Sequence, residues 1–288
     1  MIALYNRTVR RVGIAHRLVR IVVWHGGEAI VRGLIAVRRF EVPAERLLPL
    51  YKIELLVGAY ERDTVRVCEK LIGPGAVVVD VGAHVGYFTN VFSRLAGAAG
   101  RVFAFEPHPA NFQILLRNLR RRRIANVTAV QMAVSSGSGQ ATLYATPLSM
   151  GHSLLDVKAY VERVPVATVS LDGFFSAHGI ERVDLVKIDA EGGEADVLEG
   201  MRRRAGRPEP LSVILEFKPS ILVRQGRRPV ELLERLFALG FAVYAIGRGG
   251  VVRPVSAAAA EQFASSGETQ NLLALTGPLP STLRIESR

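Results

Sequence analysis

The stretch AVVVDVGAHVGYFT, residues 76–89, decides the fold class of this chain. It opens with an apolar run that carries Asp80 near its end, as expected of a buried parallel strand. Gly82 and Gly86 then mark a turn, because glycine lets the backbone approach a ligand without interference from a Cβ atom. A helix is expected from Tyr87, and its first amide groups would direct partial positive charge toward that ligand. The stretch therefore predicts a strand, a ligand-binding turn and a helix.

The glycine spacing separates this turn from the common nucleotide-binding turns. It is G-x-x-x-G rather than the G-x-G-x-x-G of a pyrophosphate site, and no G-x-x-x-x-G-K-[ST] is present to bind a triphosphate. Asp80 would either anchor a ligand group or cap the turn. Glu106 ends the next apolar run, 20 residues after Gly86, where an acid can accept ribose hydroxyls. Because neighbouring strand ends lie side by side, the turn and Glu106 together predict a nucleoside pocket.

Apolar runs alternate with amphipathic segments through the rest of the chain. Helices are expected at 87–95, 109–121, 194–203 and 230–238. Strands are expected at 76–81, 101–105, 127–134, 183–188, 211–217 and 241–246, with a closing antiparallel strand at 271–275. Polar residues at 135–140 interrupt this order and begin an inserted segment with short strands at 141–145 and 164–171. The alternation predicts an α/β fold, a mostly parallel sheet with helices on both faces.

The two ends of the chain differ from this central region. Residues 1–72 are expected to form a basic helical extension, in which residues 1–40 carry eight arginines against the single acid Glu28. A Gly-Pro-Gly sequence at 73–75 stops the helical pattern, so the main domain is expected at 73–277, followed by a loosely ordered tail at 278–288. The basic segment is typical of either a helix that docks on an anionic membrane or an accessory helix packed on the main domain. It lacks an apolar run of about 18 residues, so no transmembrane span is predicted.

Composition excludes several classes of protein. Hydrophobic residues make up 49% and charged residues 22% of the 288, which excludes disorder as the main state. The net charge is +11, but no helix-turn-helix, zinc finger or aromatic stacking motif accompanies it, so no nucleic-acid partner is expected. The single cysteine, Cys68, excludes an internal disulfide and is expected in the core. A reducing compartment fits this cysteine usage, and we expect a cytoplasmic protein, either free or peripheral to the inner face of the membrane.

Three motifs in order resemble the FkbM family of S-adenosylmethionine-dependent methyltransferases. They are residues 80–89, Phe105-Glu106-Pro107, and residues 186–194 followed by 197–200. The resemblance extends from about Tyr60 to Ile246, and three motifs in register are more specific than any one of them. It implies a class I methyltransferase (Rossmann-like) fold, with a seven-stranded, mostly parallel sheet and the cofactor over the carboxyl ends of the first strands.

The resemblance also implies which residues bind the cofactor. The methionine end of S-adenosylmethionine would lie against the glycine turn, and its ribose would be held by the acid that follows the second strand. His84 stands where the family usually has asparagine. Carried over by position, the cofactor-binding residues are Asp80, Gly82, Ala83, Gly86, Glu106 and Pro107.

The acceptor is expected beside the strand at 183–188. Asp189 and Glu191 follow this strand at the reactive edge of the sheet, and two carboxylates at this spacing can share a face. Methyl transfer to an alcohol needs in-line approach and a positioned base. Asp189 is the first candidate for that base or for a group that orients the acceptor, and Glu191 is the second, unless Glu191 caps the next helix. His152, whose surroundings resemble a histidine-and-serine segment of the family, competes with them as the base.

The predicted function is O-methylation of a hydroxyl on a sugar, glycoconjugate or polyketide-like product, an acceptor class that the resemblance implies. Glu216 ends the strand at 211–217 and, with Asp189 and Glu191, would offer oxygen ligands suited to Mg²⁺. Carboxylates orient a hydroxyl without a metal, so no metal site is predicted. Two other functions stay open: an NAD-linked oxidoreductase on a similar sheet, and a non-catalytic membrane-docking protein that keeps the fold.

Overall fold

The computed structural model describes residues 30–31, 33–43, 49–146, 152–155 and 160–286. The chain divides into two compact units, Met1–Tyr60 and Glu61–Arg288. The first unit contains helical residues at 30–31 and 33–38 and helix α3 (Pro49–Val57). Most of the basic segment predicted at 1–40 lies outside the described residues. Among the helices that are described, none has both the length and the apolar character needed to cross a membrane.

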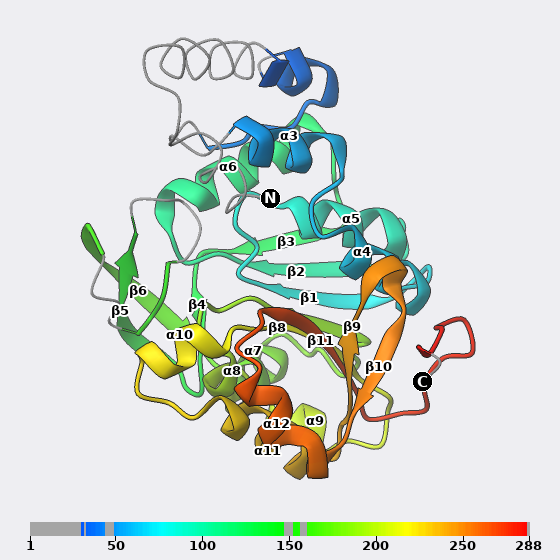
Figure 1. The fold of residues 1–288 in the computed structure, drawn as a ribbon. Helices are drawn as coiled ribbons and strands as arrows, with labels where there is room; N and C mark the ends of the chain where they lie inside the picture. Colours follow the sequence, from blue (N-terminus) through cyan, green and yellow to red (C-terminus); the bar gives the residue numbers. More distant parts are fainter. Residues whose placement is uncertain (1–29, 32, 44–48, 147–151, 156–159, 287–288) are drawn as a thin grey trace, which may run out of the picture. The chain divides into compact units, whose positions relative to one another are not determined.

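An eight-stranded sheet forms the centre of the second unit, in the order β10-β9-β11-β8-β7-β1-β2-β3 (Figure 1). Five strands pair in parallel: β1 (Val77–Val81), β2 (Arg101–Phe105), β3 (Val127–Val130), β7 (Leu185–Ile188) and β8 (Ser212–Phe217). β11 (Gln270–Leu275) lies antiparallel between β8 and β9 (Ala242–Ile246), and β10 (Val252–Val255) is antiparallel to β9. This is the predicted mostly parallel α/β sheet, with β10 added to the seven expected strands.

Helices cover both faces of this sheet (Figure 1). α4 (Arg62–Leu71), α5 (Tyr87–Ala96) and α6 (Pro109–Arg121) lie on one face. The other face packs in the main core against α7 (Leu171–Ala177), α8 (Glu194–Gly200), α9 (Arg202–Ala205), α11 (Pro229–Ala238) and α12 (Ala260–Ser265). Side chains alternate along each strand, so Val79 and Val81 enter the main core while Asp80 points toward α5. One face of β1 therefore packs in the main core, and the other face carries Asp80.

The inserted segment forms a second sheet in the order β4-β6-β5. Its strands are β4 (Ala133–Val134), β5 (Gly139–Ala145) and β6 (Glu162–Val169). The single strand predicted at 127–134 was wrong, because the chain leaves the main sheet after β3 and β4 pairs with β6 instead. Ala133 then packs with Leu143 and Val166 in a small separate core. Figure 1 shows the β5–β6 hairpin beyond the carboxyl ends of β1, β2 and β3.

Three boundaries differ from the sequence expectations. The helix predicted at 194–203 is divided into α8 and α9 at Met201, whose side chain is fully buried. The compact unit that holds the sheet begins at Glu61 rather than at residue 73, because α4 packs with α5. The tail expected to be loosely ordered is placed against β10 as far as residue 286, where Leu283 is buried and Ile285 bridges to Val252.

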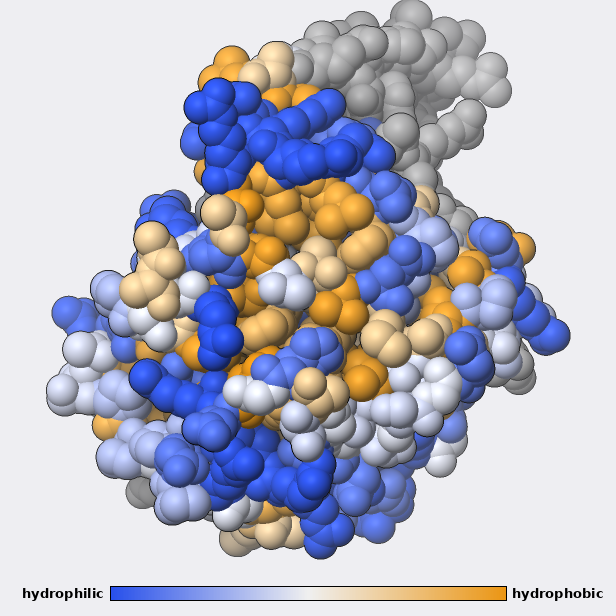
Figure 2. Space-filling view, turned by 180° about the vertical axis from the view of Figure 1, so that it is seen from behind, coloured by the Kyte–Doolittle hydropathy of each residue, from blue (hydrophilic) through white to orange (hydrophobic). Residues whose placement is uncertain are grey.

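Hydrophilic side chains gather on one part of the surface. Figure 2 shows them over the lower part of the face seen from behind. In α9, Arg203 is exposed, whereas Arg204 is buried and donates hydrogen bonds to three backbone carbonyls, among them that of Val183. Arg204 therefore has a structural role, unlike the exposed Arg203 beside it.

Candidate active site

The turn between β1 and α5 has the backbone geometry that its glycines predict. Gly82 and Gly86 have φ angles of 77° and 91°, in the left-handed region that glycine adopts at low cost. The amides of Gly82 and Ala83 donate to the carbonyl of Phe105 at 3.0 and 2.9 Å. A Cβ atom on Gly82 would overlap the backbone oxygen of Asp189. The turn is therefore packed against the ends of both neighbouring strands, β2 and β7.

His84 also has a left-handed φ angle, 52°, which is uncommon for a residue other than glycine. Its backbone N–H donates to Glu106 Oε2 at 2.8 Å. Its ring is buried, and Nε2 has no hydrogen-bond partner within the described part of the chain. Burial lowers the pKa of His84 to about 4, so the ring is neutral at pH 7.

Glu106 is buried at the end of β2, and both of its carboxylate oxygens accept backbone hydrogen bonds. Oε1 accepts from the amide of His108 at 2.9 Å, and Oε2 accepts from His84. The side chain of Asn111 also hydrogen-bonds to this carboxylate, which still keeps acceptor capacity for a ligand hydroxyl. Burial raises the pKa of Glu106 to about 7, against the opposing effect of these hydrogen bonds. The turn thus fixes the position of the predicted ribose acceptor, next to the half-buried Pro107.

Asp80 is fully buried between the turn and a lysine. Its Oδ2 accepts from Thr89 Oγ1 at 2.6 Å, and its Oδ1 has no hydrogen-bond partner among the residues described. Burial raises the pKa of Asp80, although its strand neighbour Lys187 opposes this. Lys187 Nζ lies 3.1 Å from Asp189 Oδ2 and 4.5 Å from the centre of the Phe88 ring. Lys187 therefore lies between Asp80, which neighbours it in the sheet, and Asp189, which it contacts.

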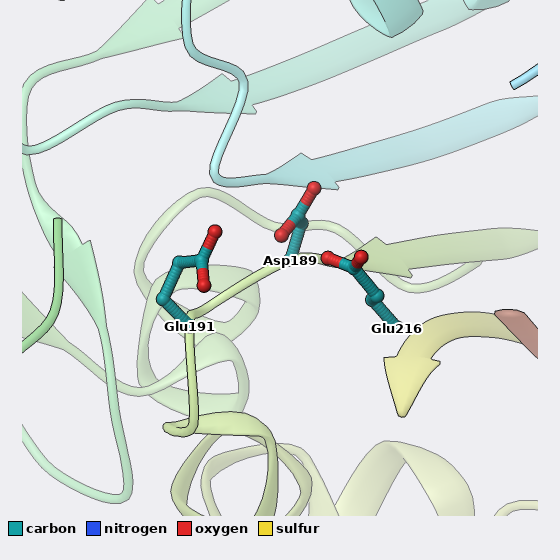
Figure 3. Close-up of side chains that lie close together, drawn as sticks. All are labelled: Asp189, Glu191 and Glu216. Carbon is teal, nitrogen blue, oxygen red and sulfur yellow. The ribbon is translucent and has the colours of Figure 1, made fainter. Parts of the chain in front are cut away.

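Asp189, Glu191 and Glu216 meet at the carboxyl ends of β7 and β8, as Figure 3 shows. One carboxylate oxygen of each lies within 4.8 Å of the others. Lys218 Nζ contacts two of them, Glu191 Oε1 at 2.9 Å and Glu216 Oε2 at 2.7 Å. The sequence predicts the grouping of the three acids, but it does not identify the ammonium group that they share.

The three carboxyl groups differ in charge. Burial tends to raise the pKa of Asp189, but Lys187 and Lys218 lower it to about 2. Burial, together with the charge of Asp189, raises the pKa of Glu216 to about 8, and burial also raises the pKa of Glu191. At pH 7 Asp189 is therefore ionised, whereas Glu216 holds a proton more readily than an ordinary carboxyl group does. Because a base with a pKa near 2 accepts protons poorly at this pH, Glu191 is the better proton acceptor.

The backbone of Glu191 is held by side chains from several elements. Its φ angle is 49°, and its carbonyl oxygen accepts from Ser153 Oγ at 2.8 Å and from Gln225 Nε2 at 3.3 Å. Glu194 Oε1 accepts the amides of Ala190 and Gly192 at 3.2 and 3.1 Å. The role of Glu194 is therefore structural, although it holds the loop before α8 rather than the helix itself.

His152 lies against His108, with ring centres 4.3 Å apart. Its Nδ1 accepts from the backbone N–H of Thr146 at 3.2 Å, which places the proton of the neutral ring on Nε2. Nε2 is buried without a hydrogen-bond partner in the regions that the structure describes. Burial lowers the pKa of His152 to about 4. His152 is therefore better suited to donate a hydrogen bond through Nε2 than to act as a base.

Buried polar atoms without partners collect on or next to the glycine turn. Asp80 Oδ1, His84 Nε2 and His152 Nε2 are three such atoms among the described residues, whereas Arg204 Nε and Gln225 Oε1 lie elsewhere. Buried polar groups in folded proteins are nearly always paired, so unpaired ones indicate a place for a polar ligand. Together with the left-handed glycines and the fixed carboxylate of Glu106, they fit the amino acid and ribose groups of an S-adenosyl cofactor.

The model of the Methyltransferase FkbM domain matches residues 80–243 of the chain. The hexuronic acid methyltransferase AglP of Haloferax volcanii is 30% identical over 153 residues, which cover 53% of this chain and 60% of AglP. The 31-O-demethyl-FK506 methyltransferase FkbM of Streptomyces tacrolimicus is 30% identical over 158 residues, 44% of this chain and 60% of FkbM. The 2-O-methyltransferase NoeI of Sinorhizobium fredii is 27% identical over 205 residues, 59% of this chain and 81% of NoeI. The chain thus spans less than two thirds of the length of AglP and FkbM.

Proposed function

The chain belongs to the FkbM methyltransferase family, and we propose that it transfers a methyl group from S-adenosylmethionine to a hydroxyl of a sugar, glycoconjugate or polyketide-like product. The observation that carries this proposal is the buried carboxylate of Glu106, held by the amide of His84 beside the left-handed turn. The names of the relatives support the acceptor class, since they include a hexuronic acid methyltransferase and a 2-O-methyltransferase.

The residues of the turn would hold the methyl donor. Glu106 would accept the two ribose hydroxyls, with Pro107 next to them. Asp80, with its unpaired Oδ1, would face the amino acid end of the donor. Gly82, Ala83 and Gly86 would leave room for the methionine portion of the donor. When bound, S-adenosylmethionine supplies an electrophilic methyl group on a positively charged sulfur.

Glu191 would act as the base and Asp189 would orient the acceptor. Glu191 would take the proton of the acceptor hydroxyl as that oxygen accepts the methyl group that the bound cofactor would supply. Asp189 stays ionised because of Lys187 and Lys218, so it would accept a hydrogen bond from a second hydroxyl of the acceptor, next to the one that reacts. His152 would donate to an acceptor oxygen through Nε2.

The ammonium group of Lys218 would make a metal ion unnecessary. It lies within 3 Å of two of the three carboxylates that would otherwise coordinate Mg²⁺. A divalent ion at the same place would be repelled by this charge. On this proposal the transfer is independent of metal, and dialysis against a chelator leaves the turnover unchanged.

A transfer assay tests the proposal. The chain is incubated with S-adenosylmethionine labelled in its methyl group and with glycan and metabolite extracts from cells that lack the chain. We expect one class of acceptor to gain the mass of one CH₂ and the label. Glu191→Gln should lower kcat by roughly 10²- to 10⁴-fold, the usual contribution of a general base, and leave the affinity for S-adenosylhomocysteine unchanged. Unchanged kcat in this variant contradicts the role of Glu191, and absence of transfer to any extract contradicts the function.

A further inference from the structure

A cluster of Tyr144, Tyr160 and Arg163 lies on the β5–β6 hairpin and has no part in the chemistry above. The two tyrosine rings lie with their centres 5.2 Å apart and their planes at 63°. The guanidinium carbon of Arg163 lies 5.7 Å from the centre of the Tyr144 ring and 5.0 Å from that of Tyr160. Arg163 Nη2 also donates to the hydroxyl of Tyr160 at 2.7 Å. We call these three residues the tyrosine–arginine cluster.

Strand register places this cluster on the face of the hairpin that contacts the loop after β7, where Glu191 lies. Tyr144 is opposite Arg163 in the β5–β6 pair and opposite Ser153 on its other side, where two backbone hydrogen bonds of 2.7 and 3.2 Å join them. Residues directly opposite one another in antiparallel strands share a face. Ser153 Oγ donates to the carbonyl of Glu191 at 2.8 Å. The side chains of the cluster therefore project from the same face as the contact with Glu191.

The opposite face of the hairpin carries the side chains that pack in the small core of the second sheet. Leu143 and Val166 are buried there with Ala133 in the small core of the second sheet. The tyrosine–arginine cluster is not part of that core, because Arg163 is exposed and both rings are only partly buried. Packing alone thus leaves this group of side chains without a role.

The charge of Arg163 is available to a ligand. Arg163 forms no ion pair with a carboxylate of any residue that the structure describes. A guanidinium has five N–H donors in one plane, of which Tyr160 takes one, and its shape matches a carboxylate or a phosphate. The contacts with both rings hold the group in place before a ligand arrives, which lowers the entropic cost of binding.

The tyrosines add an apolar surface with polar edges. Aromatic rings with a hydroxyl offer a flat apolar face and a hydrogen-bonding tip, which suits a sugar ring with its C–H face and its hydroxyls. Tyr144 lies between Arg163 and Ser153, one strand away from each. Neighbouring strands are about 4.8 Å apart, so the backbones of Arg163 and Ser153 are roughly 10 Å apart. This separation corresponds to a sugar unit next to the one whose hydroxyl is at Glu191.

We propose that the tyrosine–arginine cluster is an acceptor subsite for an anionic sugar, one that carries a carboxylate or a phosphate near the unit that is methylated. This inference rests on the proposed function and narrows its acceptor class. Arg163 binds the anionic group, and Tyr144 and Tyr160 pack against the sugar ring.

Binding of small probes to the full chain saturated with S-adenosylhomocysteine tests this subsite. The probes are methyl β-D-glucuronide, glucose 6-phosphate and the neutral methyl β-D-glucoside, and binding is followed by saturation-transfer NMR and titration. We expect at least one anionic probe to bind about tenfold or more tightly than the neutral one, the effect of one charge-assisted pair. Preference between the carboxylate and the phosphate then identifies the anionic group.

Two variants complete the experiment. Arg163→Gln should remove the preference for the anionic probe, whereas Arg123→Gln, at an exposed arginine after α6, should keep it. Equal binding of neutral and anionic probes, an unchanged preference in Arg163→Gln, or no binding of any probe to the saturated chain overturns the inference. Failure of the proposed function appears separately, as loss of S-adenosylhomocysteine binding by the unaltered chain.

Discussion

Gly82 joins the two halves of the candidate site, since its missing Cβ allows the turn after β1 to contact the backbone of Asp189. Gly82→Ala and Gly240→Ala separate this contact from backbone strain. Both residues have left-handed φ angles, 77° and 83°, but a Cβ on Gly240 would meet no atom within 4 Å. We expect Gly240→Ala to lower the free energy of unfolding by about 1–2 kcal/mol and to keep cofactor binding.

Gly82→Ala should lower the free energy of unfolding by more, about 2–4 kcal/mol, and abolish binding of S-adenosylhomocysteine, because the turn must move away from Asp189. Urea unfolding and calorimetric titration of the two variants measure both effects. Equal stability losses with equal retained binding show that the close approach has no role in the site.

On the proposed role of Glu106, cofactor binding should depend on pH. Burial raises its pKa from the ordinary carboxyl value to about 7, so the carboxyl group loses its proton between pH 6 and pH 8. The ionised form accepts both ribose hydroxyls, whereas the protonated form has lost acceptor capacity. The affinity for S-adenosylhomocysteine should therefore rise about tenfold from pH 6 to pH 8, as the ionised fraction does.

Calorimetric titration at pH 6, 7 and 8 measures this dependence, with Glu106→Gln as the control that cannot ionise. The variant should bind more weakly than the unaltered chain at pH 8 and show no such rise. An affinity that is constant or falls with pH in the unaltered chain excludes Glu106 as the ribose acceptor.

At the scale of elements, the ends of β7 and β8 place two lysines among the acids. Lys187 lies inside the apolar strand β7, and a lysine so placed has to be paired with a carboxylate. The sequence alone therefore predicts that a carboxylate pairs with Lys187. Lys218 follows β8 directly and has the pattern of an ordinary surface residue. Only the tertiary structure brings it to Glu191, which lies 27 positions earlier.

Lys218→Met should convert the acid cluster into a site for divalent cations. Without the ammonium group, Asp189, Glu191 and Glu216 repel one another, and we expect the free energy of unfolding at pH 7 to fall by about 1–3 kcal/mol. Mn²⁺ should bind this variant more tightly than the unaltered chain and restore its melting temperature. Electron paramagnetic resonance detects the bound ion. The control is Lys70→Met, at a half-buried lysine in the last turn of α4 whose Nζ donates to the carbonyl of Thr282 and contacts none of the three acids. Tighter Mn²⁺ binding by the unaltered chain contradicts the role given to Lys218.

The hydrophobic pattern predicted the strands of the main sheet well and their partners less well. β1, β2, β7 and β8 are confirmed because buried parallel strands are mainly apolar on both faces, and β1, β2 and β7 are followed directly by a glycine or an acidic residue. The pattern could not separate β3 from β4, since both segments are mainly apolar and differ only in the sheet they join. The contact of Ser153 with Glu191 was also beyond prediction, because it depends on how the inserted hairpin folds back on the main sheet.

At the scale of the whole molecule, the candidate site and the basic N-terminal segment belong to different compact units. The unit from Glu61 to Arg288 contains every residue of the candidate site. Contact of the basic residues 1–40 with an anionic membrane stays a prediction, since most of them lie outside the described residues. Liposome binding at low salt, compared between the full chain and a chain without these residues, tests it, and equal binding rejects it.

The central claim is that the turn after β1 and the carboxylate of Glu106 together bind an S-adenosyl cofactor. Calorimetric titration of the full chain with S-adenosylhomocysteine and, separately, with NADH tests it most directly. The account predicts saturable binding of S-adenosylhomocysteine at one site per chain, lost in Glu106→Ala, and no binding of NADH. Binding of NADH without binding of S-adenosylhomocysteine contradicts it.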